Sequence, residues 1–291
     1  MIEIVGKKHV TPFSKGILAG SLMKAGLDVA KAYQMAENIR AEFEACNATK
    51  VTEEELTSKI YQTLLDAGFS RVASYYKMWH SLREKKRSIV ILLGGATGIG
   101  KSTVASEISY RLGIHSIIGT DVVRELMRKM VSKDLLPTLH TSSFAVWKDI
   151  QVPSSYLSSV IYAFELQVSH VAVGINALVH RALTEGVSLL MEGIHLVPGY
   201  VTPQNETIFH FVLQLSDEKE HISRFHSRAK ESKRPPEHYI KEIGKIRQIQ
   251  DHIVGRAHKH GIPVVENETL EGTVSQVLRV IYEQLQKEAE K

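Results

Sequence analysis

One glycine-rich stretch carries the residue types needed to bind a nucleoside triphosphate. Residues 95–102 read GATGIGKS, which matches the phosphate-loop pattern GxxxxGK[ST] in full. Backbone N–H groups of such a loop turn toward the phosphates, and the following helix directs its positive end at them. Lys101 can reach the β- and γ-phosphates, and the Ser102 hydroxyl can join the coordination of Mg²⁺. The residues expected to contact the nucleotide are Gly95, Ala96, Thr97, Gly98, Ile99, Gly100, Lys101, Ser102 and Thr103.

A second candidate group follows the apolar pair Ile117-Ile118. Ligands of open α/β sheets bind beyond the carboxyl ends of the strands, where Asp121 is expected. A carboxylate at that place could accept a proton from an attacking hydroxyl or help to hold Mg²⁺. Arg124 and Arg128 share a helix face and could grip a phosphate or carboxylate of the substrate. The alternative is a helix N-cap followed by two solvated arginines.

A third apolar run, Val187–Met191, ends at Glu192. Phosphate-loop proteins place an acidic residue near the metal and its waters at such a position. The alternative is a glutamate that caps the next turn. His195 follows in the same mouth and is a candidate substrate contact.

Basic residues gather between Asp217 and the pair Pro235-Pro236. In phosphoryl-transfer enzymes a mobile segment with arginines closes over the nucleotide and neutralises charge in the transition state. We expect Arg224 to contact the nucleotide, Arg228 to act on the transferred group and Arg234 to contact the substrate. Acidic residues dilute the stretch, so a solvated helix face is the competing interpretation.

The pattern of elements around these residues predicts a doubly wound α/β domain with a parallel sheet. Short apolar runs alternate with helical stretches from residue 88 onward. The predicted strands are Ile89–Leu93, Ile117-Ile118, Val187–Met191, Ile208–Leu213 and Ile262–Val265. Long helices are predicted over Tyr156–Leu183, Glu218–Ser232, Pro236–His260 and Leu270–Ala289.

The preceding residues read as a small, mostly helical domain. Asp28 is a candidate N-cap, and Thr52 with Glu55 fits a capping box. The charge run Arg83–Arg87 is typical of a linker. We therefore place one domain at residues 1–86 and a second at 87–291.

Composition excludes several classes of protein. The net charge of +4 over 291 residues is too small to indicate nucleic-acid binding, and the basic residues lack interleaved aromatic platforms. Cys46 is the single cysteine, so neither an intrachain disulfide nor a cysteine-based zinc site can form. No signal peptide is recognised, and no apolar run approaches the about 20 residues that span a bilayer. We expect a cytoplasmic protein without a membrane partner; the patterns give no oligomeric state.

Taken in order, these motifs resemble an archaeal-type 2-phosphoglycerate kinase over essentially the whole chain. The resemblance rests on GGATGIGKSTVA (94–105), IGTDVVRELMRK (118–129) and TEGVSLLMEGIHLVPG (184–199), with support from SSFAVW (142–147) and KIRQIQDHIV (245–254). It implies a P-loop small-molecule kinase that uses ATP and Mg²⁺ to phosphorylate the free 3-hydroxyl of 2-phosphoglycerate. A related kinase for another phosphorylated acid, such as mevalonate 3-phosphate, stays open. So does a nucleotide-binding switch without chemistry of its own.

The N-terminal region resembles an ATP-cone, a helical module that binds regulatory nucleotides in other enzymes. The similar parts are PFSKGILAGSLMKAG (12–26) and VTEEEL (51–56). ATP-cones commonly carry a Lys-Arg-Asp-Gly turn, where this chain has Gly6-Lys7-Lys8-His9. Both a regulatory nucleotide site and a purely structural role are therefore open for this module.

Overall fold

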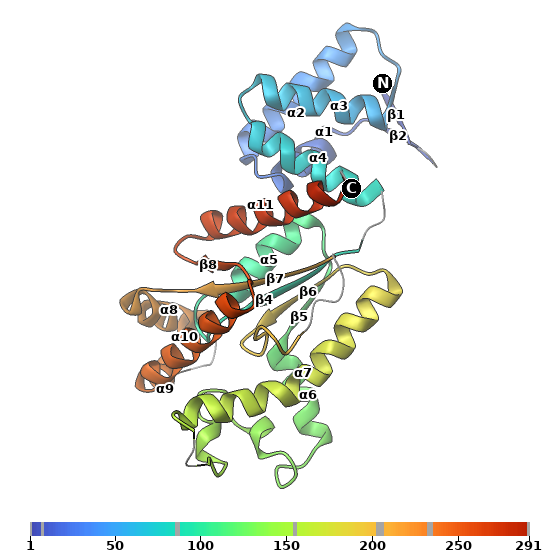
Figure 1. Ribbon diagram of the computed structural model, residues 1–291. Coiled ribbons are helices and arrows are strands. Elements are labelled where there is room, and N and C mark those ends of the chain that lie inside the picture. The colour runs from blue at the N-terminus through green and yellow to red at the C-terminus, as the bar shows by residue number, and fades with distance from the viewer. Residues whose placement is uncertain are drawn as a thin grey trace. The chain divides into compact units, whose positions relative to one another are not determined.

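The computed structural model describes residues 2–6, 9–84, 88–153, 156–201, 207–231 and 235–289 (Figure 1). The chain divides into two compact units. The first contains Met1–Arg87, Tyr110–Gly113 and Leu285–Lys291, and the second contains Ser88–Ser109 and Ile114–Gln284. The domains predicted from the sequence, 1–86 and 87–291, are consecutive. In the structure, Tyr110–Gly113 and Leu285–Lys291 group with the first unit.

The second unit is built on a parallel sheet, which confirms the predicted α/β fold. Its strands are β4 (Val90–Gly94), β5 (Ser116–Gly119), β6 (Leu189–Gly193), β7 (Ile208–Gln214) and β8 (Val264–Glu266). They lie in the order β5-β6-β4-β7-β8, and every neighbouring pair is parallel. Residues Val90–Leu93 of the central strand are fully buried, which explains their unbroken apolar character.

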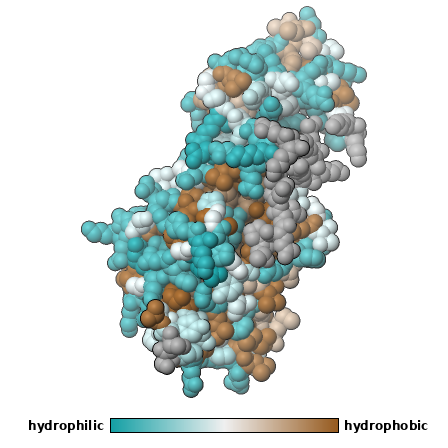
Figure 2. Space-filling view, in the orientation of Figure 1, coloured by the Kyte–Doolittle hydropathy of each residue, from teal (hydrophilic) through white to brown (hydrophobic). Residues whose placement is uncertain are grey.

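Helices cover both faces of this sheet (Figure 1). The helices α5 (Lys101–Leu112) and α11 (Leu270–Ala289) lie on one side, and α6 (Thr120–Met130), α7 (Ser159–Glu185) and α10 (Ile243–Lys259) lie on the other. Hydrophilic residues predominate on the face drawn in Figure 2, as expected of helices whose apolar sides face a sheet. Short 3₁₀ turns at Pro137–His140 and Val146–Lys148 connect α6 to α7.

The longest helix, α7, is a core helix. It is long and apolar enough to cross a membrane by length and composition. Its side chains Val171, Ile175 and Val179 are instead buried against the sheet. Ser158 caps its first turn by accepting from Ile161 N at 3.3 Å, and Gly186 ends it in the left-handed conformation at φ 66°. Burial against the sheet accounts for the hydropathy of α7.

The helix expected over residues 236–260 is in fact two helices. After α8 (Glu218–Glu231) the chain forms α9 (Pro236–Lys241), and α10 begins only at Ile243. Glu242 lies between them with φ −104° and ψ 15°, and its carboxylate accepts hydrogen bonds from Lys148 and Lys245. These two lysines lower the Glu242 pKa, Lys245 contributing more. The break between α9 and α10 lies at Glu242, whose buried carboxylate is held by two lysines. The spacing of apolar residues in the sequence does not reveal such a contact.

The first unit contains a small sheet beside four helices. The helices are α1 (Lys15–Lys24), α2 (Val29–Ala45), α3 (Glu53–Asp66) and α4 (Ser70–Glu84). The Asp28 cap of α2 and the Thr52–Glu55 capping box of α3 are both confirmed. The strands β1 (Glu3–Val5), β2 (Val10–Pro12) and β3 (Lys50–Thr52) were not expected, because three-residue strands are too short to show alternation.

The strand order brings the predicted site residues to one edge of the sheet. Glu192, near the end of β6, is in register with Leu93 of β4 on one side and with Gly119 of β5 on the other. The loop after β4 and the helix start after β5 therefore flank this carboxylate. Because β4 lies between β6 and β7, the site occupies the position where chain connections leave in opposite directions, as in other open α/β sheets.

Candidate active site

The loop after β4 has a backbone that its glycines alone permit. Gly95, Gly98 and Gly100 have φ values of 141°, 88° and 87°. A Cβ on Gly95 would lie 2.5 Å from the Leu213 carbonyl oxygen, and one on Gly98 would lie 2.4 Å from Cε1 of Phe225. The left-handed φ angles and the close neighbours both require glycine. The result is the cradle of backbone N–H groups that a phosphate-binding loop needs.

Three side chains from outside this loop hydrogen-bond to two of its carbonyl oxygens. His221 Nε2 lies 2.8 Å from the Thr97 carbonyl oxygen, which can only accept, so this nitrogen carries the proton. Arg224 Nη1 and Asn267 Nδ2 donate to the Ile99 carbonyl oxygen at 2.9 and 2.5 Å. The Arg224 side chain also lines the cavity described below. Arg224, which the sequence predicted to contact the nucleotide, therefore holds the phosphate loop in place and also faces the cavity.

The Lys101 ammonium lies inside the loop. Its residue is only 8% exposed, and Nζ donates to the Ala96 carbonyl oxygen at 2.6 Å. Burial lowers the pKa of Lys101, while the carboxylates of Glu192 and Asp121 act in the opposite direction. The two acids thus help to keep the buried amine protonated.

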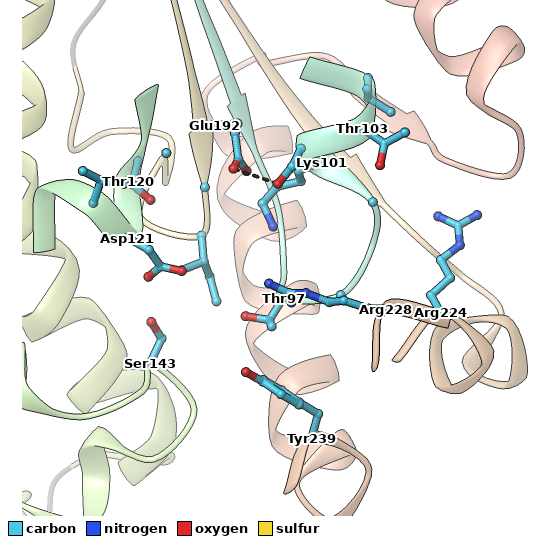
Figure 3. Close-up of a pocket in the computed structure, with 18 of the residues that line it drawn as sticks. Thr97, Lys101, Thr103, Thr120, Asp121, Ser143, Glu192, Arg224, Arg228 and Tyr239 are labelled. Atoms are coloured by element: carbon cyan, nitrogen blue, oxygen red, sulfur yellow. Dashed lines mark hydrogen bonds between the residues drawn. The ribbon is translucent and has the colours of Figure 1, made fainter. Parts of the chain in front are cut away.

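Ser102 and Glu192 form the pair expected at a magnesium site. The Ser102 hydroxyl donates to Glu192 Oε1 at 2.9 Å (Figure 3). Within the described ranges no three His, Cys, Asp or Glu side chains group as a metal site. Mg²⁺ at phosphoryl-transfer sites usually takes one or two carboxylates and completes its shell with phosphates and waters. The oxygen donors of Ser102, Glu192 and Asp121 fit that hard cation.

Asp121 occupies the first turn of α6, across the cavity from the loop (Figure 3). Its Oδ1 lies 3.5 Å from Arg124 Nε. Burial would raise the pKa of Asp121, but its surroundings lower that pKa overall, and the cations Arg124 and Lys101 contribute to the lowering. Asp121 is thus a carboxylate at neutral pH and can accept a proton or bind a cation.

These residues line one cavity of about 930 Å³, which is large enough for a nucleotide and a small second substrate. One part is formed by the loop with Thr103, Arg224 and Asn267. The other is formed by Asp121 and Arg124 with a wall whose residues were not among the predicted site residues: Ser142, Ser143, Phe144 and Tyr239. Arg228 reaches into the cavity beside Thr97, and the Tyr239 hydroxyl points into it (Figure 3).

A stack of rings joins the two parts of the cavity. His221 stacks on Phe225 at a centroid distance of 5.1 Å, and Phe225 stacks on Tyr239 at 5.1 Å. Phe144 meets Tyr239 edge-on at 5.8 Å. We call His221, Phe225, Tyr239 and Phe144 the aromatic stack. One end contacts the phosphate loop through His221, and the other end is part of the opposite wall.

Two expected substrate contacts, Arg128 and His195, differ in position, and a third is not described. Arg128 does not line the cavity, because its guanidinium pairs with Glu125, with Nη2 at 2.8 Å from Oε1. His195 is fully buried behind the cavity wall, where its ring nitrogens bond to other side chains. Arg234 lies outside the described residues.

Comparison of the sequence with those of known proteins shows which family the chain belongs to. The chain is 46% identical to the 2-phosphoglycerate kinase of Thermococcus kodakarensis over 280 residues, covering 96% of each chain. It is 43% identical to the 2-phosphoglycerate kinase of Pyrococcus horikoshii, covering 97% of this chain and 94% of that one. For the 2-phosphoglycerate kinase of Methanothermobacter thermautotrophicus the identity is 38%, covering 99% and 96%. The chain belongs to the 2-phosphoglycerate kinase family. The resemblance noted in the sequence is thereby confirmed.

Other comparisons add little to this family assignment. No model of a protein family matches the chain. A shikimate kinase from Acinetobacter baumannii is similar in structure, with a TM-score of 0.41 and 13% identity over 73% of this chain and 99% of that one. A similarity at that level says nothing about substrate. The likeness of the first unit to ATP-cones stays a prediction.

Because a kinase must bind a phosphoryl donor and an acceptor together, we expect one substrate in each part of the cavity. We call the part at the phosphate loop the donor part and the wall of Ser142, Ser143, Phe144 and Tyr239 the acceptor wall. The donor part could be found in the sequence from one contiguous motif. The acceptor wall could not be assembled from the sequence. Ser143 and Phe144 lie in the stretch 142–147, to which no role was assigned, and Tyr239 lies in a distant segment.

The buried histidines predict a loss of stability in acid. Burial lowers the pKa of His195 and of His210 to about 4. In the unfolded chain these rings take up protons near pH 6.5, so unfolding binds protons between about pH 6.5 and 4. The free energy of unfolding should therefore fall as the pH drops through that range. Urea unfolding at a series of pH values measures this.

The variant His210→Gln is the control for that measurement. His210 Nε2 donates to the Leu196 carbonyl oxygen at 3.3 Å, a bond that a glutamine amide can replace. The slope of unfolding free energy against pH should become shallower in this variant. An unchanged slope, or equal wild-type stability at pH 7 and pH 5, would contradict the assignment of neutral buried rings.

Proposed function

We propose that the chain transfers the γ-phosphoryl group of ATP to the 3-hydroxyl of 2-phosphoglycerate, giving 2,3-diphosphoglycerate. One observation carries the proposal: Lys101, Glu192 and Asp121 converge on one cavity in a chain that is up to 46% identical to curated 2-phosphoglycerate kinases. The acceptor carries a phosphate, a carboxylate and a primary hydroxyl. Its charge suits a wall that includes Arg124 and Arg228.

On the donor side, Lys101 and the loop N–H groups bind the triphosphate. Lys101 Nζ lies inside the loop, where it donates to the Ala96 carbonyl oxygen. The same ammonium would donate to β- and γ-phosphate oxygens. The brace of Arg224 and Asn267 on the Ile99 carbonyl oxygen turns that carbonyl away from the phosphates. The loop is thus oriented before the nucleotide binds, which reduces the cost of binding.

On the acceptor side, Asp121 orients the attacking hydroxyl and accepts its proton. Its lowered pKa keeps it ionised at neutral pH. Arg228 reaches in from α8, where its charge can offset that of the transferred group. Mg²⁺, held by Ser102 and Glu192 with Asp121 nearby, would supply charge neutralisation of the phosphates. Arg234, expected to contact the substrate, lies outside the described residues.

Two alternative functions left open by the sequence differ from the proposed one in the acceptor that they require. A kinase for mevalonate 3-phosphate would use the same donor part, and a nucleotide-binding switch would need no acceptor part. A cavity with Asp121, Arg124 and Tyr239 opposite the loop favours a kinase over a switch. A regulatory nucleotide at the first unit also stays a proposal. It rests on the resemblance of residues 12–26 and 51–56 to ATP-cones. The departure from the ATP-cone turn is at residues 6–9, of which Lys7 and Lys8 lie outside the described ranges.

The acceptor is tested by a screen with γ-labelled ATP and Mg²⁺. We expect label in 2-phosphoglycerate and at least about tenfold less with 3-phosphoglycerate, mevalonate and mevalonate 3-phosphate, because discrimination by a site built around polar contacts is large. Label in mevalonate 3-phosphate alone would overturn the substrate. Slow hydrolysis of ATP with no labelled acid would favour the switch.

The donor site is tested by Lys101→Ala. Removing the ammonium takes away charge stabilisation of the transferred group, so the turnover number should fall by about a hundredfold or more. Thermal unfolding should show that the variant folds. Lys259→Ala, an exposed position on α10, is the matched control and should keep wild-type turnover. Near-normal turnover in Lys101→Ala would contradict the assignment.

The acceptor wall is tested by Tyr239→Phe, which keeps the ring in the aromatic stack and removes only the hydroxyl that points into the cavity (Figure 3). The KM for the acceptor should rise by about fivefold, as expected for one lost hydrogen bond, while the KM for ATP stays unchanged. Tyr33→Phe removes an exposed hydroxyl from the first unit and serves as the control. An unchanged acceptor KM would exclude the Tyr239 hydroxyl from acceptor binding.

A further inference from the structure

A buried polar network lies behind the acceptor wall. His195 and Gln167 are both completely buried, although neither side chain is apolar. His195 follows β6, and Gln167 belongs to α7, so the two residues join elements far apart in the chain. Buried polar side chains are stabilising only when their hydrogen bonds are made. The bonds of these two residues lead to residues 138–143 on one side and to the start of α6 on the other.

The direction of each hydrogen bond follows from Gln167. Its Nε2 donates to the carbonyl oxygens of Thr138 at 2.5 Å and Thr141 at 3.0 Å, which leaves Oε1 facing His195. His195 Nε2 lies 3.2 Å from that oxygen and must carry the proton. His195 Nδ1 is then an acceptor, and the Thr120 hydroxyl donates to it at 2.9 Å. The imidazole is thus neutral with one fixed tautomer.

Both ends of the network reach the cavity. Thr120 begins α6 immediately before Asp121 and lines the cavity. Ser143 lines the facing wall, and its Oγ lies 3.4 Å from the same His195 Nε2. His195 and Gln167 do not line the cavity. The imidazole therefore touches the groups on either side of the acceptor without reaching the acceptor.

The chain makes room for the contact with Thr120. Gly193 has φ 154°, and a Cβ there would lie 1.8 Å from the Thr120 hydroxyl oxygen. No side chain other than hydrogen fits between β6 and the start of α6. The close approach at Gly193 is what places Thr120 within hydrogen-bond distance of His195.

Arg124 is connected to the same segment. Its Nη1 donates to the Leu139 carbonyl oxygen at 3.0 Å and lies 3.4 Å from the Thr141 carbonyl oxygen, which Gln167 also contacts. The other side of the guanidinium pairs with Asp121. The positions of Asp121, Arg124 and Ser143 are therefore all set by one group of hydrogen bonds.

We infer that His195, with Gln167 and Thr120, is a positioning residue that fixes Asp121 relative to the wall at residues 141–143, and so directs the acceptor hydroxyl toward the phosphoryl group. This inference rests on the proposed kinase function. Loss of the network should change how the acceptor binds and reacts, and should leave the donor part, braced by Arg224 and Asn267, unaffected.

The first test compares Thr120→Val with Thr120→Ser. Valine keeps the shape of threonine and removes the donor to His195 Nδ1, whereas serine keeps the hydroxyl. For Thr120→Val we expect kcat/KM for the acceptor to fall by about ten- to a hundredfold, because a buried acceptor is left unpaired. The KM for ATP should stay within about twofold. Thr120→Ser should recover most of the loss. Equal kinetics in the two variants would overturn the inference.

A second comparison separates positioning from stability. Gln167→Met removes the link between His195 and residues 138–141. Gln250→Met removes an equally buried amide on α10, 4% exposed, that binds the backbone N–H and carbonyl oxygen of Leu215. Both variants should lower the temperature of unfolding. Only Gln167→Met should raise the acceptor KM and lower kcat. Similar kinetic losses in both would indicate a merely structural role and contradict the inference.

Hydrogen exchange tests the network independently of the substrate. Backbone amides of residues 137–144 should exchange faster in Thr120→Val and Gln167→Met than in the wild type and in Gln250→Met. Unchanged exchange there would contradict the inference whichever acid is the acceptor. A wild-type chain that does not phosphorylate 2-phosphoglycerate would contradict the proposed function alone. An active wild type with unaffected Thr120→Val would contradict only the positioning role.

Discussion

The constraint on which this site depends is the burial of one positive charge. Lys101 must lie within the loop to reach the phosphates, yet taking an ammonium out of water favours its neutral form. The compensation comes from the Ala96 carbonyl oxygen and from the carboxylates of Glu192 and Asp121. The two acids therefore have a task before any substrate binds. The strand order that places β6 beside β4 is what brings Glu192 close enough to perform it.

The sequence predicted the parts of the site that are local in the chain. The phosphate loop, Asp121 and Glu192 each follow directly on an apolar run, and the ends of parallel strands meet at one edge of the sheet. The same reasoning misplaced Arg128 and His195. Position on a helix face does not reveal that Glu125 has paired with Arg128, and position after a strand does not reveal that the chain turns His195 inward.

The parts that could not be predicted depend on contacts between distant segments. Gln167 lies on a helix whose apolar periodicity gives no reason to single out one amide. Asn267 follows β8 and Tyr239 lies within α9, and neither residue belongs to a motif of the sequence. The break at Glu242 depends on Lys148, which is far away in the chain. Such partners become visible only when the fold places them together, which is why the donor part was predicted in more detail than the acceptor part.

Through the contacts of the aromatic stack, the residue types tolerated on one side of the cavity depend on those on the other side. A side chain on Gly98 would collide with Phe225, and Phe225 in turn stacks on Tyr239. Phe144 completes the contact from the segment before α7. A larger or smaller ring at any one of these positions would have to be matched at its neighbours. The phosphate loop and the acceptor wall therefore cannot diverge independently in evolution, and a relative that recognises a different acid would be expected to differ in several members of the stack at once.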